Sequence, residues 1–295
     1  MTNGRYDRQE LLFGREGQDK LEAQTVAIVG LGGLGSHVAQ QLAYLGVRAY
    51  ALIDHDHATL SNLNRLVGAT EDDARRSSLK TDIAERMIKT ILPSARVTSL
   101  ADTFISDEAF ALLKQTDFVF GCVDHDGARL VLNEFCQAYE RPYLDLASDI
   151  DPETKDFGGR FLYSDGRVCV SCRELLDERA VRLAFSTESQ RQEEERIYGI
   201  RRGALGEAGP AVVSLNGIIA SVAVTEYMVE ITGVRPAYLH GEYKGMMGVL
   251  TRDRNLADFG CYYCKSLRGQ GAAADIEHYI REGWGNRWLT EALKS

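Results

Sequence analysis

The sequence has no excess of positive charge and no long uninterrupted hydrophobic run. Its 34 Lys and Arg residues are outnumbered by 43 Asp and Glu residues, which gives a formal net charge of -9. A broad binding surface for nucleic acid or for an anionic membrane is therefore not expected, although a local basic pocket is compatible with this balance. The longest apolar stretch, residues 212–232, contains Asn216, Glu226 and Glu230, and it predicts a buried helix and not a membrane span.

The sequence also lacks the apolar N-terminal segment of a secretory signal, so a cytoplasmic protein is expected. It has no internal repeat or low-complexity tract. Its 44% hydrophobic and 26% charged residues are typical of a globular protein and exclude the disordered and fibrous classes. In a cytoplasmic chain the 6 cysteines are expected to be free, metal-bound or catalytic, and not paired in disulfides.

Residues 25–147 alternate between short apolar runs rich in β-branched residues and longer helical segments, as in a parallel sheet with crossover helices. Strands are predicted at residues 25–30, 49–54, 95–100, 117–122 and 142–147. The helices between them are predicted near residues 34–45, 79–91, 106–114 and 127–140. A chain of 295 residues is long enough for one large or two modest domains. We therefore expect an α/β fold with a doubly wound, Rossmann-like, mostly parallel sheet.

The pattern changes after residue 147. The elements predicted there are a strand, a turn and a strand over residues 158–170, a long helix over 210–232, and strands at 237–243 and 247–252. The polar stretch 185–202 predicts a mobile surface loop or an exposed helix, because it cannot bury much apolar surface. The tail, residues 265–295, is amphipathic. Both this tail and the stretch 185–202 are candidate docking surfaces; the alternatives are a solvated linker for the stretch, and for the tail a helix packed on its own domain or on a dimer partner.

A glycine-rich turn joins the first predicted strand to the first predicted helix. Its glycines are Gly30, Gly32, Gly33 and Gly35. They allow a tight turn and the close approach of a phosphate to the helix N-terminus. Asp54 ends the next predicted strand, where its carboxylate can accept hydrogen bonds from ribose hydroxyls. This arrangement predicts a site for NAD or ATP; the alternative is a glycine turn needed only for helix–strand packing.

The side chains that follow favour ATP over NAD. Asn62 and Arg65 lie just beyond Asp54, and Lys80 begins the next helix; Arg and Lys suit the charge of a triphosphate. Asp124 follows a later strand, at the sheet edge that forms the crevice of such folds, where a carboxylate can hold Mg²⁺ against phosphates. Taken singly, Arg65 and Lys80 are equally well explained as solvated surface charges, and Asp124 as a turn or helix cap.

The order of these motifs resembles the ThiF/MoeB/HesA adenylyltransferases, which are similar to the adenylation domains of ubiquitin-activating enzymes. The resemblance rests on RYDRQ (5–9), GLGGLG (30–35), DHD followed by SNLNR (54–65), Lys80, VDHDGAR (123–129) and two CxxC pairs, and covers the chain from Arg5 to Cys264. It implies that ATP is bound by Asp54, Asp56, Asn62, Arg65 and Lys80. It also implies that Mg²⁺ is bound by Asp124, and that Arg8 reaches the triphosphate on the other subunit of a homodimer.

The two CxxC pairs are Cys169 with Cys172 and Cys261 with Cys264. Four thiolates can close a tetrahedral structural Zn²⁺ site, which would pin the C-terminal segment onto the middle of the fold. The resemblance implies the same site, and the alternatives are redox dithiols or buried thiols. The two remaining cysteines, Cys122 and Cys136, are predicted to be packing residues.

The activity that the resemblance implies is ATP-dependent adenylation of the C-terminal carboxylate of a ubiquitin-like or sulfur-carrier protein that ends in glycine, with Arg8, Arg65, Lys80 and Asp124 as catalytic residues. Some relatives then use a cysteine on the crossover loop, but residues 202–210 contain none. The acyl-adenylate is therefore expected to pass to a separate sulfurtransferase or conjugating enzyme. The alternatives are adenylation of a small-molecule or RNA-borne carboxylate, and an NAD-dependent oxidoreductase.

Four segments are expected along the chain. They are an N-terminal arm contributing to the dimer partner (1–21), an ATP-binding domain (22–150), a region with the crossover loop and the zinc clasp (151–264) and a tail (265–295).

Overall fold

The computed structural model describes residues 4–187, 210–254 and 260–292, and its centre is one sheet of 8 strands in the order β3-β2-β1-β4-β5-β6-β7-β8. The parallel strands are β1 (Thr25–Val29), β2 (Ala49–Ile53), β3 (Arg96–Leu100), β4 (Phe118–Gly121) and β5 (Tyr143–Ile150). The antiparallel strands are β6 (Phe157–Ser164), β7 (His240–Lys244) and β8 (Val249–Asp253). The chain reverses its strand order between β1 and β4, and ligands of such sheets bind at that point, beyond the carboxyl ends of the strands.

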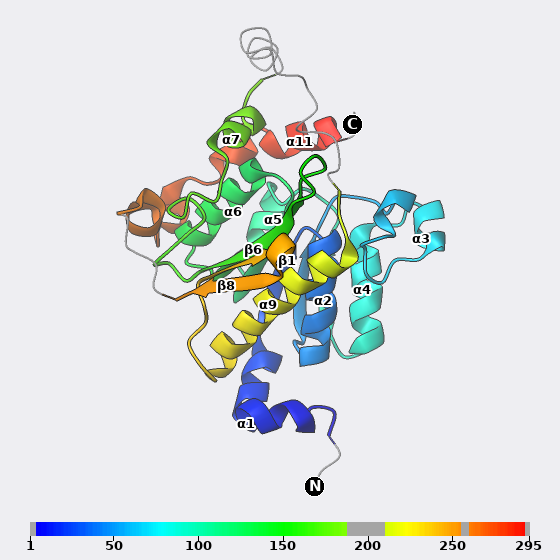
Figure 1. The fold of residues 1–295 in the computed structure, drawn as a ribbon. Helices are drawn as coiled ribbons and strands as arrows, with labels where there is room; N and C mark the ends of the chain where they lie inside the picture. The colour runs from blue at the N-terminus through cyan, green and yellow to red at the C-terminus, as the bar shows by residue number, and fades with distance from the viewer. Residues whose placement is uncertain (1–3, 188–209, 255–259, 293–295) are drawn as a thin grey trace.

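Helices cover both faces of the sheet (Figure 1). The helices on one face are α2 (Gly33–Leu45), α4 (Lys80–Ile91) and α9 (Val213–Thr232). Those on the other face are α5 (Asp107–Leu113) and α6 (Asp126–Ala138). Shorter helices are α3 (Glu71–Arg75), α7 (Glu178–Ala184), α10 (His278–Arg281) and α11 (Trp284–Ala292), with single turns η1 (Leu60–Asn62), η3 (Gly245–Met247), η4 (Tyr263–Leu267) and η5 (Gly271–Ala274). The expected doubly wound, mostly parallel sheet is confirmed.

The core lies between the sheet and its two helix layers. Every residue of β2 and of β4 is buried, as expected for parallel strands covered on both faces. Tyr227 of α9 packs edge-on against Phe118 and Phe120 of β4, with ring centroids 4.8 and 5.5 Å away. The long apolar stretch is thus a buried helix, and among the described residues no helix is both long and apolar enough to cross a membrane.

The hairpin predicted over residues 158–170 is wrong in its second half. β6 ends at Ser164, and residues 165–170 form a turn. The Ser164 hydroxyl donates to the carbonyl of Val168 at 2.7 Å and closes that turn. β6 pairs instead with β7, so the apolar Val168–Val170 segment is buried in a turn and not in a strand.

The tail packs on its own chain. Tyr279 of α10 donates to Glu134 of α6 at 3.0 Å, and the indole of Trp288 in α11 donates to the carbonyl of Ala184 at 3.0 Å. Ile276 is 1% exposed. Of the polar stretch 185–202, residues 188–202 lie outside the described residues.

Candidate functional site

The glycine turn has the geometry that its sequence predicts. Gly30 has φ +86°, and a Cβ there would lie 2.6 Å from the carbonyl oxygen of Cys122. A Cβ at Gly35 would collide with the carbonyl oxygen of Gly30, so larger residues would push α2 away from β1. The N-cap residue of α2 is Gly32, which has no side chain to satisfy the first N–H groups of the helix. The turn therefore presents an open helix N-terminus at the edge of the sheet.

Asp54 braces this turn. It follows β2, and its two oxygens accept hydrogen bonds from the backbone N–H of Leu31 at 2.5 Å and of Asp56 at 2.8 Å. Burial raises the pKa of the Asp54 carboxyl, and the nearby ammonium of Lys80 opposes that rise. The sequence predicts a partner for ribose here; the structure adds that the same carboxylate fixes the shape of the glycine turn.

A largely buried cation lies beside Asp54. The Lys80 ammonium, at the first residue of α4, is 2.7 Å from an oxygen of Asp56, and the Lys80 side chain is 12% exposed. Burial lowers the pKa of Lys80, but the charges of Asp54 and Asp56, together with that of Asp124, outweigh burial and raise it. The ammonium therefore stays protonated and is held in place by the carboxylates before any ligand binds.

Arg65 and Asn62 are partly occupied by local contacts. The Arg65 guanidinium donates to the carbonyl of Ser61 at 2.8 Å and to the side chain of Asn64 at 3.0 Å. Asn62 forms a capping box with Thr59 around η1, and its side-chain oxygen accepts from the Thr59 N–H at 3.4 Å. The Arg65 side chain also passes Gly33, since its Cδ would be 3.5 Å from a Cβ built on that glycine. Arg65 is thus brought to the glycine turn.

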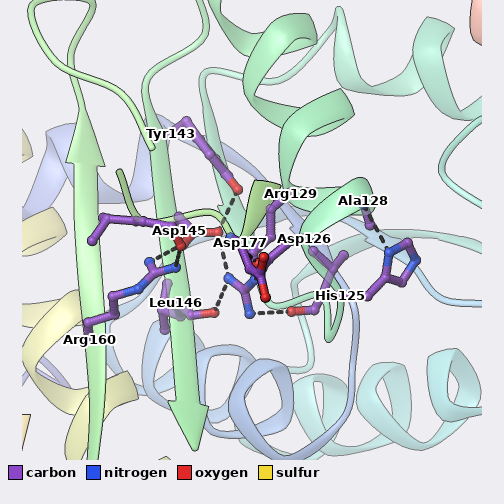
Figure 2. Close-up of polar contacts among 11 residues, drawn as sticks. His125, Asp126, Ala128, Arg129, Tyr143, Asp145, Leu146, Arg160 and Asp177 are labelled. Carbon is purple, nitrogen blue, oxygen red and sulfur yellow. Dashed lines mark hydrogen bonds and ion pairs between the residues drawn. The ribbon is translucent and has the colours of Figure 1, made fainter. Parts of the chain in front are cut away.

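Asp124 is exposed in the turn between β4 and α6. The same turn is held by a buried ion network, shown in Figure 2, that the sequence analysis missed. Arg129 of α6 donates to the carbonyl of Val123 at 2.6 Å and to Asp145 of β5 at 2.7 Å. The other oxygen of Asp145 accepts from Arg160 of β6 at 2.6 Å. The network ties the turn that carries Asp124 to two strands. The sequence shows Arg129 five residues after Asp124. Nothing in the sequence pattern indicated that Asp145 and Arg160 would lie next to it.

Arg8 is not brought to this site in its own chain. It is exposed near the start of α1 (Asp7–Ala23), which Figure 1 shows at the end of α2 and α9 opposite to α7 and α11. The neighbouring Gln9 donates to the carbonyl of Leu45 at 3.0 Å, at the C-terminal end of α2. The glycine turn is at the N-terminal end of the same helix, about 20 Å away for 13 residues at about 1.5 Å each.

Two clusters of side chains can be tested as metal sites. Ligand atoms of Asp54, His55 and Asp56 lie within 4.8 Å of one another. However, backbone N–H groups bind both oxygens of Asp54, and the Lys80 ammonium binds Asp56. The Lys80 ammonium is already the cation of this cluster, so the cluster does not fit a resident metal ion. The exposed carboxylate of Asp124 remains the better candidate for Mg²⁺ that arrives with phosphates.

The four CxxC cysteines do fit a zinc ion. The Sγ atoms of Cys169, Cys172, Cys261 and Cys264 all lie within 4.8 Å of one another, and none is in a disulfide. Cys169 and Cys261 are 3.7 Å apart at sulfur, close to the edge of about 3.8 Å of a tetrahedron with Zn–S bonds of about 2.3 Å. The backbone N–H of Cys169 points at the sulfur of Cys172, at 3.1 Å. Cys122 is largely enclosed and Cys136 fully buried, and burial raises the pKa of both thiols, which makes them poor nucleophiles.

Comparison with known proteins gives a consistent result. The model of the ThiF family matches residues 6–257. The molybdopterin-synthase adenylyltransferase of Escherichia coli is 35% identical over 174 residues, which are 58% of this chain and 68% of that protein. The sulfur carrier protein ThiS adenylyltransferase of Bacillus subtilis is 33% identical over 143 residues, 48% of this chain and 43% of that protein. The adenylyltransferase and sulfurtransferase MOCS3 of Drosophila willistoni is 37% identical over 142 residues, 48% of this chain and 31% of that protein.

These matches span between about a third and two thirds of the length of each relative. Solved structures share the fold over more of the chain. E. coli MccB, crystallised with succinimide, superposes with a TM-score of 0.70 at 21% identity, covering 90% of this chain and 74% of that one. PaaA superposes with a TM-score of 0.62 at 20% identity, covering 85% of this chain and 82% of that one.

Proposed function

Because this chain belongs to the ThiF family, we propose that it is an adenylyltransferase that uses ATP to activate a carboxylate. The observation that carries the proposal is the arrangement around the glycine turn. Four features gather at the carboxyl edge of the sheet: an open helix N-terminus, the bracing carboxylate of Asp54, the largely buried ammonium of Lys80 and the side chain of Arg65. Donors and cations here suit the charge of a triphosphate better than that of a dinucleotide.

The reaction needs alignment and charge neutralisation more than proton transfer. A carboxylate oxygen attacks the α-phosphorus, the new P–O bond forms, and the bond to the bridging oxygen breaks with its electrons leaving on pyrophosphate. The nucleophile is already ionised at pH 7, so no general base is required. Lys80 and Arg65 stabilise the departing charge. Asp124 is the residue that would hold Mg²⁺, which supplies further charge neutralisation when it is bound with the nucleotide.

Arg8 acts on the partner subunit of a homodimer. Its exposed guanidinium and its distance from the glycine turn of its own chain support this assignment. Leu11 and Leu12 on the same helix are 88% and 60% exposed, so α1 has apolar surface that a second copy would cover. A zinc ion on the four CxxC cysteines is structural, because four protein ligands leave no position open for substrate.

The acceptor is the C-terminal carboxylate of a small ubiquitin-like or sulfur-carrier protein ending in glycine. Support comes from the curated relatives, two of which are named as adenylyltransferases of ThiS and of molybdopterin synthase. The chain contains no cysteine from Arg173 to Gly260, a range that includes the whole segment before α9. On this proposal the chain does not carry the acyl group as a thioester. A separate sulfurtransferase or conjugating enzyme receives it.

The test is exchange of labelled pyrophosphate into ATP. The probe is a purified sulfur-carrier protein with a terminal Gly-Gly, and its control is the same carrier lacking the last glycine. We expect exchange with the intact carrier alone, and a loss of roughly 10²- to 10³-fold in Asp124→Ala, since one preorganised electrostatic group is removed. Asp72→Ala, which removes an exposed carboxylate of α3, should exchange as the wild type does. Undiminished exchange in folded Asp124→Ala would remove the role of Asp124.

A further inference from the structure

A second helix N-terminus lies beside the glycine turn. α9 runs parallel to α2, because His37 lies 3.2 Å from the carbonyl of Val213 and Gln41 donates to Ser221 at 3.0 Å further along both helices. The two helices therefore begin at the same edge of the sheet. The N-cap of α9 is Val212, which makes no side-chain cap, so the first N–H groups of this 20-residue helix are also uncapped by a side chain.

A buried amide connects the two helix ends. Asn216, in the first turn of α9, is 3% exposed. Its oxygen accepts from the hydroxyl of Ser148 on β5 at 2.7 Å, which fixes the direction of the amide. Its Nδ2 group lies against Gly33, so closely that a Cβ on this glycine would overlap it. Among the described residues Nδ2 has no hydrogen-bond acceptor, whereas the oxygen of the same amide has one, so Nδ2 is available to a ligand at the turn.

We infer that Asn216 is a nucleotide-binding residue, whose Nδ2 group donates a hydrogen bond to a phosphate oxygen held at the N-terminus of α2. The inference rests on the proposed use of ATP and names a further residue of that site. Two donors meet at Gly33, the N-terminus of α2 and the Nδ2 group of Asn216, and the Cδ of Arg65 passes the same glycine. A set of donors without an acceptor selects an anion, and the nucleotide brings its phosphates to this turn.

Ser148 is a positioning residue in this arrangement. Its hydroxyl holds the Asn216 oxygen away from Gly33 and so keeps Nδ2 directed at the turn. Loss of the hydroxyl would allow the amide to rotate and place its oxygen against the phosphate. Asn216 therefore depends on β5 for its orientation and on α9 for its position.

Calorimetric titration of ATP, with adenosine as a ligand that lacks phosphates, tests the inference. Asn216→Asp is the main variant, because it keeps an oxygen for Ser148 and replaces only the donor with a negative oxygen. We expect it to bind ATP at least about 100-fold more weakly, Asn216→Ala about tenfold more weakly, and Ser148→Ala between the wild type and Asn216→Ala. All three should bind adenosine as the wild type does.

Ser221→Ala is the matched control, since it removes one side-chain hydrogen bond between α9 and α2 away from the turn. It should bind both ligands normally. Unchanged ATP affinity in folded Asn216→Asp overturns the inference, and so does an equal loss of ATP and adenosine, which would mark a structural role. Absence of ATP binding by the wild-type protein instead refutes the proposed function itself, and the inference with it.

Discussion

Replacement of the buried residue Asp145 should clearly lower the free energy of unfolding. It is fully buried and accepts hydrogen bonds from Arg129 at 2.7 Å, Arg160 at 2.6 Å and the Tyr143 hydroxyl at 2.9 Å. Asp145→Asn keeps the shape but removes the charge between two guanidinium groups, and turns an NH₂ donor toward other donors. Breaking a buried ion pair on one side costs about 3–5 kcal/mol.

The assay is urea unfolding followed by circular dichroism, with zinc kept at one concentration. With an m-value of about 2.5–3 kcal/mol/M, a loss of 3–5 kcal/mol lowers the midpoint by roughly 1–2 M. The control is Glu71→Gln, which makes the same carboxyl-to-amide change in the exposed pair with Arg75 and should leave the midpoint unchanged. If Asp145→Asn shifts the midpoint no more than Glu71→Gln does, the reasoning about the buried network is refuted.

The pH dependence has a defined sign. Burial alone would raise the pKa of Asp145, but Arg129 and then Arg160 outweigh it and lower the pKa. A carboxyl whose folded pKa lies below its unfolded value of about 3.9 contributes stability above that pH and loses it as the pH falls. The difference in unfolding free energy between the wild type and Asp145→Asn should thus be constant from about pH 6 to 8 and shrink below about pH 4.

Three further outcomes are expected. Metal analysis should find about one zinc per chain. Cys261→Ser should strongly lower the midpoint of thermal unfolding, because a structural zinc site binds its ion with a free energy of about 10–16 kcal/mol. Protein that lacks zinc after purification without a chelator would contradict this prediction. Arg8→Ala and Asp124→Ala should each exchange pyrophosphate poorly. After the two variants are mixed and have exchanged subunits, activity should recover towards about a quarter of the wild-type value, because each mixed dimer holds one intact site. No recovery despite verified subunit exchange would mean that Arg8 acts within its own chain. Wild-type protein incubated with ATP and carrier should form no thiol-sensitive adduct, as gel analysis with and without reductant would reveal.

Local patterns in the sequence were enough for the fold class and for most of the candidate site. Short apolar runs rich in β-branched residues, alternating with helical segments, indicate a parallel sheet, because strands covered by helices on both faces are apolar along their whole length. The glycine turn, Asp54 and Lys80 were predictable because they sit at or next to the ends of strands and helices, and such ends meet at one edge of the sheet. The CxxC pairs were equally predictable, because the two cysteines of each pair are close together in the sequence.

Tertiary packing decided what each of these residues contacts. Asn216 is a single polar residue in an apolar helix, and only the parallel packing of α9 on α2 directs its amide at Gly33. Arg129 meets Asp145 because β5 pairs with β4 beneath α6, and the length of α2 separates Arg8 from the glycine turn of its own chain. Contacts between residues far apart in sequence depend on how helices and strands pack in space, and sequence spacing carries no record of that packing.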